Sequence, residues 1–429
     1  MYSFLIKQFR DIKEQGLKEL LKKIKIFFYF TLIFPFYFFT VSLAAPFVIL
    51  IRIIKPLAHI RFRKIFTNEL GHFVDDAGIL LCESVLNNSN IKDWYWLTKP
   101  TSNRQFEKMV KRTFYVRWWV KYLYIANNII PGGKKYTALP PRITQKSRDI
   151  RGLLHKTKKI KKAYFNFLEK EQNYARKYLR DIGLNKKDKF VCLNVRDSTY
   201  KNYLYPDKKW DYHNYRDSDI ATYEQAIEAL AEKGYWIFRT GKVVSKPLNC
   251  KHKKVIDYAM SKKKNDFLDI WLMANCSFCV TTGSGLDSVP LIYRKPILFI
   301  NFLPIDQIVT YAPTLTYFKH LRWRNKNREL NFKECLDNTY YCDTEYDSNG
   351  IDIVDLTSNE IKDAVIEMEK RVRGSWIDKT EDTKLQDRFW HILKKCDYYR
   401  GKSWFIHPEA KVSSVFLHSN SDVGKFLNL

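Results

Sequence analysis

Four predicted strands end in side chains that suit a phosphate-bearing ligand. In chain order these are Arg196, Arg239 with Lys242, Asp257 with Tyr258, and the loop from Thr281 to Gly285. In a parallel sheet the carboxyl ends of the strands lie at one edge, so we expect these side chains to gather there. Two guanidinium groups match the oxygens of a diphosphate, because each forms paired hydrogen bonds to it. The set predicts a diphosphate site, although any single arginine would also fit a surface ion pair.

The loop from Thr281 to Gly285 belongs to a compact strand–helix–strand pattern. An apolar run, Phe278 to Val280, precedes the loop; a helical segment, Leu286 to Tyr293, follows it; and a second apolar run covers Pro296 to Phe302. This order is a minimal βαβ unit. Glycines let a backbone approach a ligand, hydroxyls hydrogen-bond to it, and a helix N-terminus attracts an anion. The candidate binding residues in this pattern are Thr282, Gly283, Ser284, Gly285 and Asp287.

Two further patterns concern proton transfer and metal binding. His72 ends a loop after a predicted strand, where a general base would lie; the alternative is a loop histidine bonded to the backbone. Asp75 and Asp76 are expected in the first turn of the next helix, where the helix dipole alone favours them. Asp217-Ser-Asp219 has the form of a metal-binding Asp-x-Asp. Because no apolar strand precedes it and a helix follows, we interpret it as a helix cap and predict an enzyme that needs no metal.

The composition indicates a globular chain with an anionic partner. Its 429 residues suffice for two domains, and its formal net charge of +28 suits a phosphorylated substrate or an acidic membrane surface. Nucleic acid is not favoured, because no zinc-finger spacing or RNA-binding aromatic motif occurs. Eight irregularly spaced cysteines indicate a reducing compartment, and the lone Cys276-x-x-Cys279 pair is interpreted as structural. No dinucleotide-binding, Walker or serine-hydrolase motif is present, which disfavours NAD and ATP as cofactors.

An uncharged stretch near the N-terminus predicts membrane attachment. Ile26 to Ile51 carries no charged residue, and as one helix it would extend about 39 Å, enough to cross a bilayer. Lysines and arginines flank it on both sides, so charge does not select an orientation. Pro35 and Pro46 offer break points for a re-entrant hairpin, whereas the length slightly favours a single span; a buried core helix is the remaining alternative. Met1 to Ile24 has the pattern of a basic amphipathic helix on an anionic membrane surface, and a solvated or self-packed helix is the alternative.

Strands alternate with helices along the rest of the chain, so the predicted class is α/β with parallel sheets. We expect two Rossmann-like domains preceded by a membrane-associated helical segment. In the first domain we expect a third strand at Tyr115 to Val120 and a long helix at Lys159 to Asp181. The expected parts are an amphipathic helix at 1–25, a membrane segment at 26–57, a first domain at 58–182, a second, ligand-binding domain at 183–345, and helices at 346–429 that pack back on the first domain.

Four segments together resemble a known family. These are CLNVRD, NYRDSDIATYEQAIEALAEKGYWIFRTGK, VIDYA and TTGSGLDSVPLIYRKPILFINF. They are similar to bacterial glycosyltransferases of capsule, O-antigen and other surface-polysaccharide assembly. Less closely, they resemble fucosyltransferases and heptosyltransferases of the GT-B fold. The resemblance covers Arg61 to Leu429 and is strongest from Val191 to Asn301.

The resemblance implies a GT-B-like, metal-independent transferase whose second domain binds a nucleotide-sugar. It requires no cofactor. The implied catalytic residues are His72, Arg196 and Arg239. The implied donor-binding residues are Lys242, Asp257, Tyr258, Thr282, Gly283, Ser284, Gly285 and Asp287. The arginine loop reads Arg-Asp-Ser here, which departs from the fucosyltransferase pattern and argues against a fucose donor.

The expected acceptor is a glycan, lipid-linked and presented at the cytoplasmic face of a bacterial inner membrane. It would face the first domain, with His72 near the cleft between the domains. Two alternatives stay open: a non-catalytic, membrane-bound scaffold or glycan-binding module on a decayed transferase fold, and a membrane phosphotransferase. The phosphotransferase would need an acidic or metal site near the membrane helix, and the sequence shows no such pattern.

Overall fold

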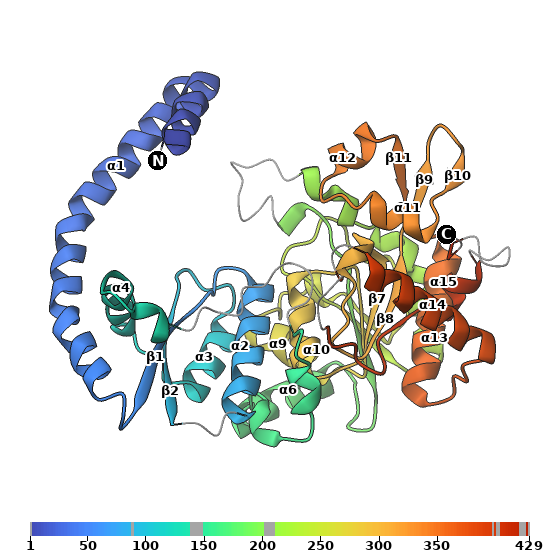
Figure 1. Cartoon of the computed structure of the whole chain (residues 1–429). Coiled ribbons are helices and arrows are strands. Elements are labelled where there is room, and N and C mark those ends of the chain that lie inside the picture. Colours follow the sequence, from blue (N-terminus) through green and yellow to red (C-terminus); the bar gives the residue numbers. More distant parts are fainter. Residues whose placement is uncertain are drawn as a thin grey trace. The chain divides into compact units, whose positions relative to one another are not determined.

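The chain folds into two compact units that exchange segments along the sequence (Figure 1). The computed structural model describes residues 2–86, 90–137, 149–200, 211–396, 399, 404–419 and 426–427. Unit 1 contains Met1–Lys64, Ser89–Leu97 and Phe114–Leu139, and unit 2 contains Ile65–Asn88, Thr98–Thr113 and Pro140–Leu429. The predicted first domain, 58–182, is therefore divided between the two units.

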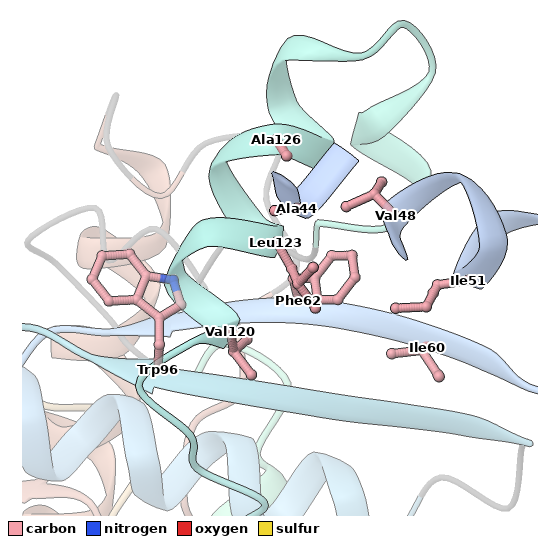
Figure 2. Packing of buried hydrophobic residues seen from close by; sticks show 9 residues of the cluster. All are labelled: Ala44, Val48, Ile51, Ile60, Phe62, Trp96, Val120, Leu123 and Ala126. Atoms are coloured by element: carbon pink, nitrogen blue, oxygen red, sulfur yellow. The ribbon is translucent and has the colours of Figure 1, made fainter. Parts of the chain in front are cut away.

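Unit 1 combines one long helix with a small sheet. Its elements are α1 (Tyr2–Ile53), β1 (His59–Ile65), β2 (Ile91–Leu97), α4 (Val120–Ile129) and the 3₁₀ turn η1 (Gly133–Lys135). The helix α1 is interrupted at Gly16, whose φ of 68° lies in the left-handed region that glycine tolerates. β1 and β2 form a two-stranded sheet. Apolar side chains of α1, α4 and this sheet form its core (Figure 2): Ala44, Val48, Ile51, Ile60, Phe62, Trp96, Val120, Leu123 and Ala126.

Unit 2 is built on a seven-stranded parallel sheet in the order β12-β8-β7-β6-β3-β4-β5. The strands are β3 (Phe190–Asn194), β4 (Trp236–Arg239), β5 (Val255–Ile256), β6 (Cys279–Thr281), β7 (Ile297–Phe302), β8 (Thr314–Phe318) and β12 (Lys411–Val412). Every residue of β3, β6, β7 and β8 is buried, as expected for strands covered on both faces. The prediction of an α/β fold with a parallel sheet is confirmed.

Helices from both ends of the sequence pack in unit 2. They are α2 (Leu70–Leu86), α3 (Arg104–Thr113), α5 (Leu153–Lys156), α6 (Glu169–Asp181), α8 (Glu224–Glu232), α9 (Asp266–Asn275), α10 (Ser288–Ile292), α13 (Ser358–Arg373), α14 (Thr380–Lys395) and α15 (Ser414–Ser419). α2 packs on α10 and α3 packs on α9, which explains why these two early helices belong to the sheet unit.

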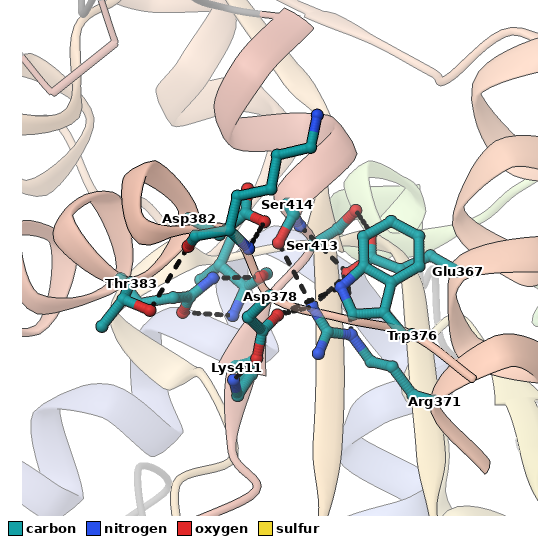
Figure 3. A network of polar contacts seen from close by, with 12 residues as sticks. Glu367, Arg371, Trp376, Asp378, Asp382, Thr383, Lys411, Ser413 and Ser414 are labelled. Atoms are coloured by element: carbon teal, nitrogen blue, oxygen red, sulfur yellow. Dashed lines mark hydrogen bonds and ion pairs between the residues drawn. The ribbon is translucent and has the colours of Figure 1, made fainter. Parts of the chain in front are cut away.

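The C-terminal helices pack within unit 2, where α13 packs against α8, β7 and α15. The cause is the apolar face of α13, in which Ile361, Ala364 and Val365 are buried. We expected these helices to pack back on the first domain; further along the chain, the Phe405 amide donates to the carbonyl of Ile150, a residue of that predicted domain, at 3.1 Å. A polar network then fixes the following segments (Figure 3): the buried Glu367 accepts hydrogen bonds from Ser413 Oγ at 2.6 Å and from the Ser414 amide at 3.1 Å.

A smaller antiparallel sheet, β10-β9-β11, follows β8 in the chain. Its strands are β9 (His320–Trp323), β10 (Arg328–Glu329) and β11 (Ile351–Val354), with the short helices α11 (Phe332–Asp337) and α12 (Asp343–Ser348) between them. α12 packs against the 3₁₀ helix η3 (Asp211–Arg216). This insertion therefore supports the segment that carries Arg216.

Two predicted elements of the first domain differ in the structure. The expected strand at Tyr115 to Val120 contributes a single bridge, between Val116 and Tyr95, because α4 begins at Val120. The expected helix at Lys159 to Asp181 begins only at Glu169, after a 3₁₀ turn at Lys161–Ala163. Among the described residues of 58–182, the strands form the two-stranded sheet β1-β2, so a second Rossmann-like sheet is not found there. Residues 138–148 lie outside the described residues.

Candidate ligand site at the carboxyl edge of the sheet

The strand order reverses between β3 and β6, where a doubly wound sheet opens a crevice beyond the carboxyl ends of its strands. From β3 the chain proceeds to β4 and β5 on one side, and then to β6, β7 and β8 on the other. The order β5-β4-β3-β6-β7-β8 is that of the Rossmann fold, in which ligands bind where the order reverses, beyond the carboxyl ends of the strands. Here that position is formed by residues after Asn194 and after Thr281.

A buried carboxylate organises the loop after β6. Asp287 Oδ1 accepts hydrogen bonds from Thr281 Oγ1 at 2.7 Å and from Asn194 Nδ2 at 2.9 Å, and its Oδ2 accepts one from the Ser284 amide. Asn194 Nδ2 also donates to Ser284 Oγ at 2.6 Å. Burial raises the pKa of Asp287 to about 6, although the hydrogen bonds from Thr281, Ser284 and Asn194 oppose the rise. Asp287 therefore shapes the loop from within, which differs from its predicted contact with a ligand.

Two arginines meet this loop. The Arg196 amide donates to Thr282 Oγ1 at 2.9 Å, and its guanidinium Nε lies 3.1 Å from Asp217 Oδ1. Arg216 Nη2 donates to the Gly283 carbonyl at 2.7 Å. Burial, and next the charge of Arg216, lower the pKa of Arg196 to about 10. Arg196 and Arg216 thus bond to neighbouring residues of one loop, Thr282 and Gly283.

Arg216 was missing from the predicted set, and it is the main addition from the structure. A signal was present, since Arg216 directly precedes the Asp-Ser-Asp sequence that we interpreted as a cap. That interpretation is confirmed for Asp219, which caps the 3₁₀ helix η4 (Ile220–Tyr223) and accepts a hydrogen bond from the Ala221 amide at 3.2 Å. In the same segment Asp217 pairs with Arg196, and burial raises its pKa to about 6.

Arg239 lies inside the protein, which differs from its predicted place facing a ligand. Its side chain is 1% exposed, and its Nη1 donates to the Lys246 carbonyl at 2.9 Å and to Asp257 Oδ1 at 3.2 Å. Asp257 Oδ2 also accepts from the Leu248 amide at 2.8 Å. The pair therefore fixes the segment after β4 against the end of β5. The physical reason is that Arg239 is the last residue of β4 and is enclosed by the chain that follows it.

Lys242 and Tyr258 lie at the same end of β4 and β5 and are engaged with α9. Lys242 Nζ lies 2.6 Å from Asp266 Oδ1, in the first turn of that helix. Tyr258 is fully buried, and its hydroxyl donates to Asp269 Oδ1 at 2.8 Å. Burial and the charge of Asp269 raise the pKa of Tyr258. These contacts are internal supports, and Tyr258 has no surface with which to contact a ligand.

His72 lies in α2 rather than in a loop, because the helix begins at Leu70. Its ring is 45% exposed, with Nε2 3.5 Å from Glu69 Oε2. The start of this helix contacts the β6 loop through two glycines: a Cβ on Gly71 would lie 2.9 Å from Gly285 Cα. Gly285 therefore allows the backbone of the β6 loop to pack closely against the backbone of α2, where a side chain would not fit. Asp75 and Asp76 are buried deeper in the helix, beyond the first turn where we expected them.

The structure thus brings together Arg196, Arg216 and the loop Thr282–Ser284 at the crevice, with the start of α2 beside the loop. Cationic forks, hydroxyls and a glycine that carries a φ of 85° can hold a diphosphate. Among the described residues no group of three or more His, Cys, Asp or Glu is arranged to hold a metal ion. The arrangement suits an anionic ligand bound by positive charge.

A separate cavity of about 150 Å³ lies near the amino end of β8, at the edge of the sheet opposite to the carboxyl ends of the strands. It adjoins Pro313, just before β8, and includes the rings of His155 and His407, 4.6 Å apart. Burial, with His155 and Lys158, lowers the pKa of His407 to about 4. None of the predicted site residues lines this cavity, and it lies away from the crevice where a sheet of this order binds ligands.

The comparisons with known proteins give distant structural similarities. The sequence matches no protein-family model and no curated protein. Similar solved structures include a family 9 glycosyl transferase from Veillonella parvula DSM 2008, with a TM-score of 0.40 and 11% identity over 61% of this chain and 86% of that one. Another is the E. coli ADP-heptose LPS heptosyltransferase II, with a TM-score of 0.39 and 11% identity over 73% of this chain and 99% of that one.

A third similar structure is an E. coli heptosyltransferase solved with ADP, with a TM-score of 0.32 and 10% identity over 60% of this chain and 90% of that one. These proteins are glycosyltransferases by name. Similarities of this size carry no argument about the activity of this chain.

Proposed function

We propose that this protein is a glycosyltransferase that takes a sugar from a nucleotide-sugar bound between the ends of β3 and β6. The observation that carries the proposal is that the Arg196 amide and the Arg216 guanidinium both bond to the Thr282–Ser284 loop, at the reversal of a Rossmann-order sheet. Such a position suits the diphosphate of a nucleotide. The sugar is inferred from the sequence resemblance to glycosyltransferases.

The proposed reaction is a direct displacement at the anomeric carbon. The acceptor oxygen forms a bond to that carbon, the bond to the diphosphate oxygen breaks, and the acceptor proton passes to a base. His72 is the candidate base. Arg196 and Arg216 stabilise the negative charge that develops on the departing nucleoside diphosphate. No bound metal or cofactor takes part in this scheme.

The proposal extends to the setting of the enzyme. We place it on the cytoplasmic face of a bacterial inner membrane, acting on a lipid-linked glycan in capsule or O-antigen assembly. Support comes from the uncharged N-terminal stretch, the net charge of +28 and the sequence resemblance to surface-polysaccharide transferases. The donor sugar is left open, with fucose disfavoured by the Arg196-Asp-Ser sequence.

The test is ligand-induced stabilisation of the full-length protein in detergent. A panel of nucleoside diphosphates and sugar nucleotides is compared by thermal unfolding, and a ligand at one hundred times its Kd stabilises the folded state by about 2.7 kcal/mol. Arg216→Ala should weaken binding of the active ligand about ten-fold or more, because a charge-assisted contact is lost. Arg322→Ala is the control, since that side chain is exposed and, among the described residues, donates a hydrogen bond to the Asn327 carbonyl at 3.5 Å.

Two observations favour the non-catalytic alternative: Arg239 is enclosed, and His72 lies beside Glu69. A scaffold on a decayed transferase fold would respond to none of the nucleotides. A response that Arg216→Ala removes and Arg322→Ala retains supports the transferase site. Transfer of a radiolabelled sugar from the responding donor then distinguishes an enzyme from a nucleotide-binding module.

A further inference from the structure

The apolar part of α1 has the length of a membrane span. Thr31–Ile53 is long and apolar enough to cross a membrane, judged by length and composition, with 23 residues and a mean hydropathy of 2.0. At 1.5 Å per residue it extends about 34 Å, against a hydrocarbon core of about 30 Å. Only 11% of its most apolar stretch is buried in the protein. Length alone therefore leaves a crossing helix and a helix lying along the membrane equally open.

Packing within unit 1 distinguishes these two arrangements. The ring of Tyr37 lies 6.2 Å from the ring of Tyr122, just inside α4, and Val48 is fully buried in the core shared with α4 and β1 (Figure 2). At the far end, Arg52 Nη2 donates to the Asn127 carbonyl at 2.9 Å and Nη1 donates to the Pro131 carbonyl at 2.6 Å. From residue 37 to residue 52, one side of α1 is therefore covered by α4 and the sheet.

A crossing helix would carry these partners into the hydrocarbon. α4 brings Lys121 and Asn127, and β1 brings Arg61, which is paired with Asp93 at 2.7 Å. A two-stranded sheet also has open edges, whose unpaired backbone groups each cost several kcal/mol in lipid. Burying these charged and polar groups in lipid is unfavourable. A helix that lies in the interface avoids this cost, because it immerses only its apolar side, by about 5–10 Å.

Exposed apolar side chains on both helices suit that shallow position. We call them the α1–α4 patch: the exposed apolar side chains of α1 from Leu32 to Ile53 together with Trp118 and Ile129. Leu32, Trp118 and Ile129 are 78%, 77% and 69% exposed. The segments of unit 1 contain 17 lysines and arginines against 4 aspartates and glutamates. An apolar patch within a strongly basic unit is complementary to anionic lipid.

We infer that α1 and α4 form one membrane-binding unit that lies in the plane of an anionic bilayer and does not cross it. Trp118 and Ile129 of the α4 region enter the interface together with α1. This inference rests on the membrane attachment proposed above, and it does not depend on sugar transfer. It replaces the single span, which the sequence slightly favoured over a re-entrant hairpin.

Sidedness tests the arrangement directly in the full-length chain. Different epitope tags are placed at the two ends, and protease is added to intact spheroplasts of an expressing bacterium. An in-plane anchor keeps both tags on one face, so both are digested or both are protected until lysis. Protection of one tag and loss of the other would show a crossing helix and overturn the inference.

Vesicle flotation tests the part assigned to α4. The double variant Trp118→Glu, Ile129→Glu should lower partition into phosphatidylglycerol vesicles about ten-fold or more, because two exposed apolar side chains lose their membrane contact. Ile377→Glu is the matched control: Ile377 is 85% exposed in unit 2 and should have no effect. Unchanged circular dichroism shows that the double variant stays folded.

The outcomes separate this inference from the proposals on which it builds. If the double variant floats like the wild type, α1 binds alone and the shared unit is refuted. If wild-type protein does not float with anionic vesicles, membrane attachment itself is wrong. Equal flotation with neutral phosphatidylcholine would remove the assigned preference for anionic lipid. None of these results bears on the nucleotide panel, which tests the transferase site.

Discussion

Arg239, the last residue of β4, is expected to stabilise the folded state and not to bind the ligand. Arg239→Ala leaves Asp257 without its cation, although that carboxylate keeps its bond to the Leu248 amide. Breaking a buried pair from one side costs about 3–5 kcal/mol, so we expect a loss of unfolding free energy near the lower end of that range. Urea unfolding of the full-length protein measures it, with Arg322→Ala as the exposed control. Unchanged stability with lost nucleotide binding would return Arg239 to the ligand site.

Residue types predicted part of the site and could not predict the rest. The strand-end rule brought Arg196, Thr282 and Ser284 together correctly, because their places follow from the adjacency of β3 and β6. Arg216 reaches Gly283 across 67 residues of sequence, and its segment is held by α12. No local pattern encodes such a contact. The enclosure of Arg239 likewise depends on the chain after β4 folding back over it.

At the scale of elements, His320 ties the small sheet to α13. Its Nδ1 lies 3.1 Å from Glu329 Oε1 of β10, and its Nε2 lies 2.8 Å from Glu360 Oε1 in the first turn of α13. Burial lowers the pKa of His320, but the hydrogen bonds to Glu329 and Glu360 outweigh it and raise the pKa to about 9. The imidazolium is therefore the form that the folded state favours.

This raised pKa predicts a loss of stability in alkali. The contribution is fully present below the unfolded pKa of about 6.5 and is lost as the pH rises through about 9. Between those limits the wild type should lose on the order of 2 kcal/mol more unfolding free energy than His320→Gln does. Urea titrations of both proteins at the two ends of this range measure the difference. Equal losses would show that His320 carries no such linkage.

Elements were predicted well where the sequence pattern is local and periodic. The helix Ser358–Arg373 is of this kind, because its apolar face repeats at the helical period and the Thr357 side chain caps it by accepting a hydrogen bond from the Glu360 amide. The apolar runs of β3, β6 and β7 were likewise recognised as strands. Tyr115 to Val120 is aromatic and β-branched, yet α4 begins at its last residue, since packing against α1 overrides strand propensity there.

At the scale of the whole molecule, the chain alternates between its two units. Three segments build unit 1 and three build unit 2, so neither unit is a continuous stretch. A boundary drawn between residues 182 and 183 could not represent this order, because contacts distant in sequence decide it. Because α1 packs with segments that come later in the chain, it is part of a folded unit as well as a candidate membrane anchor.

Truncation tests that double role. Removing residues 1–57 takes away Ala44, Val48 and Ile51, three of the buried members of the core in Figure 2, and uncovers Phe62 and Leu123. We expect the shortened protein to aggregate or to lose the packed state of unit 1, because losses of this size cost several kcal/mol. Removing residues 2–30 spares this core and should leave a protein that unfolds like the full chain in detergent. Size-exclusion chromatography and thermal unfolding compare the two, and a stable, monomeric protein beginning at Ala58 would show that α1 is dispensable for the fold.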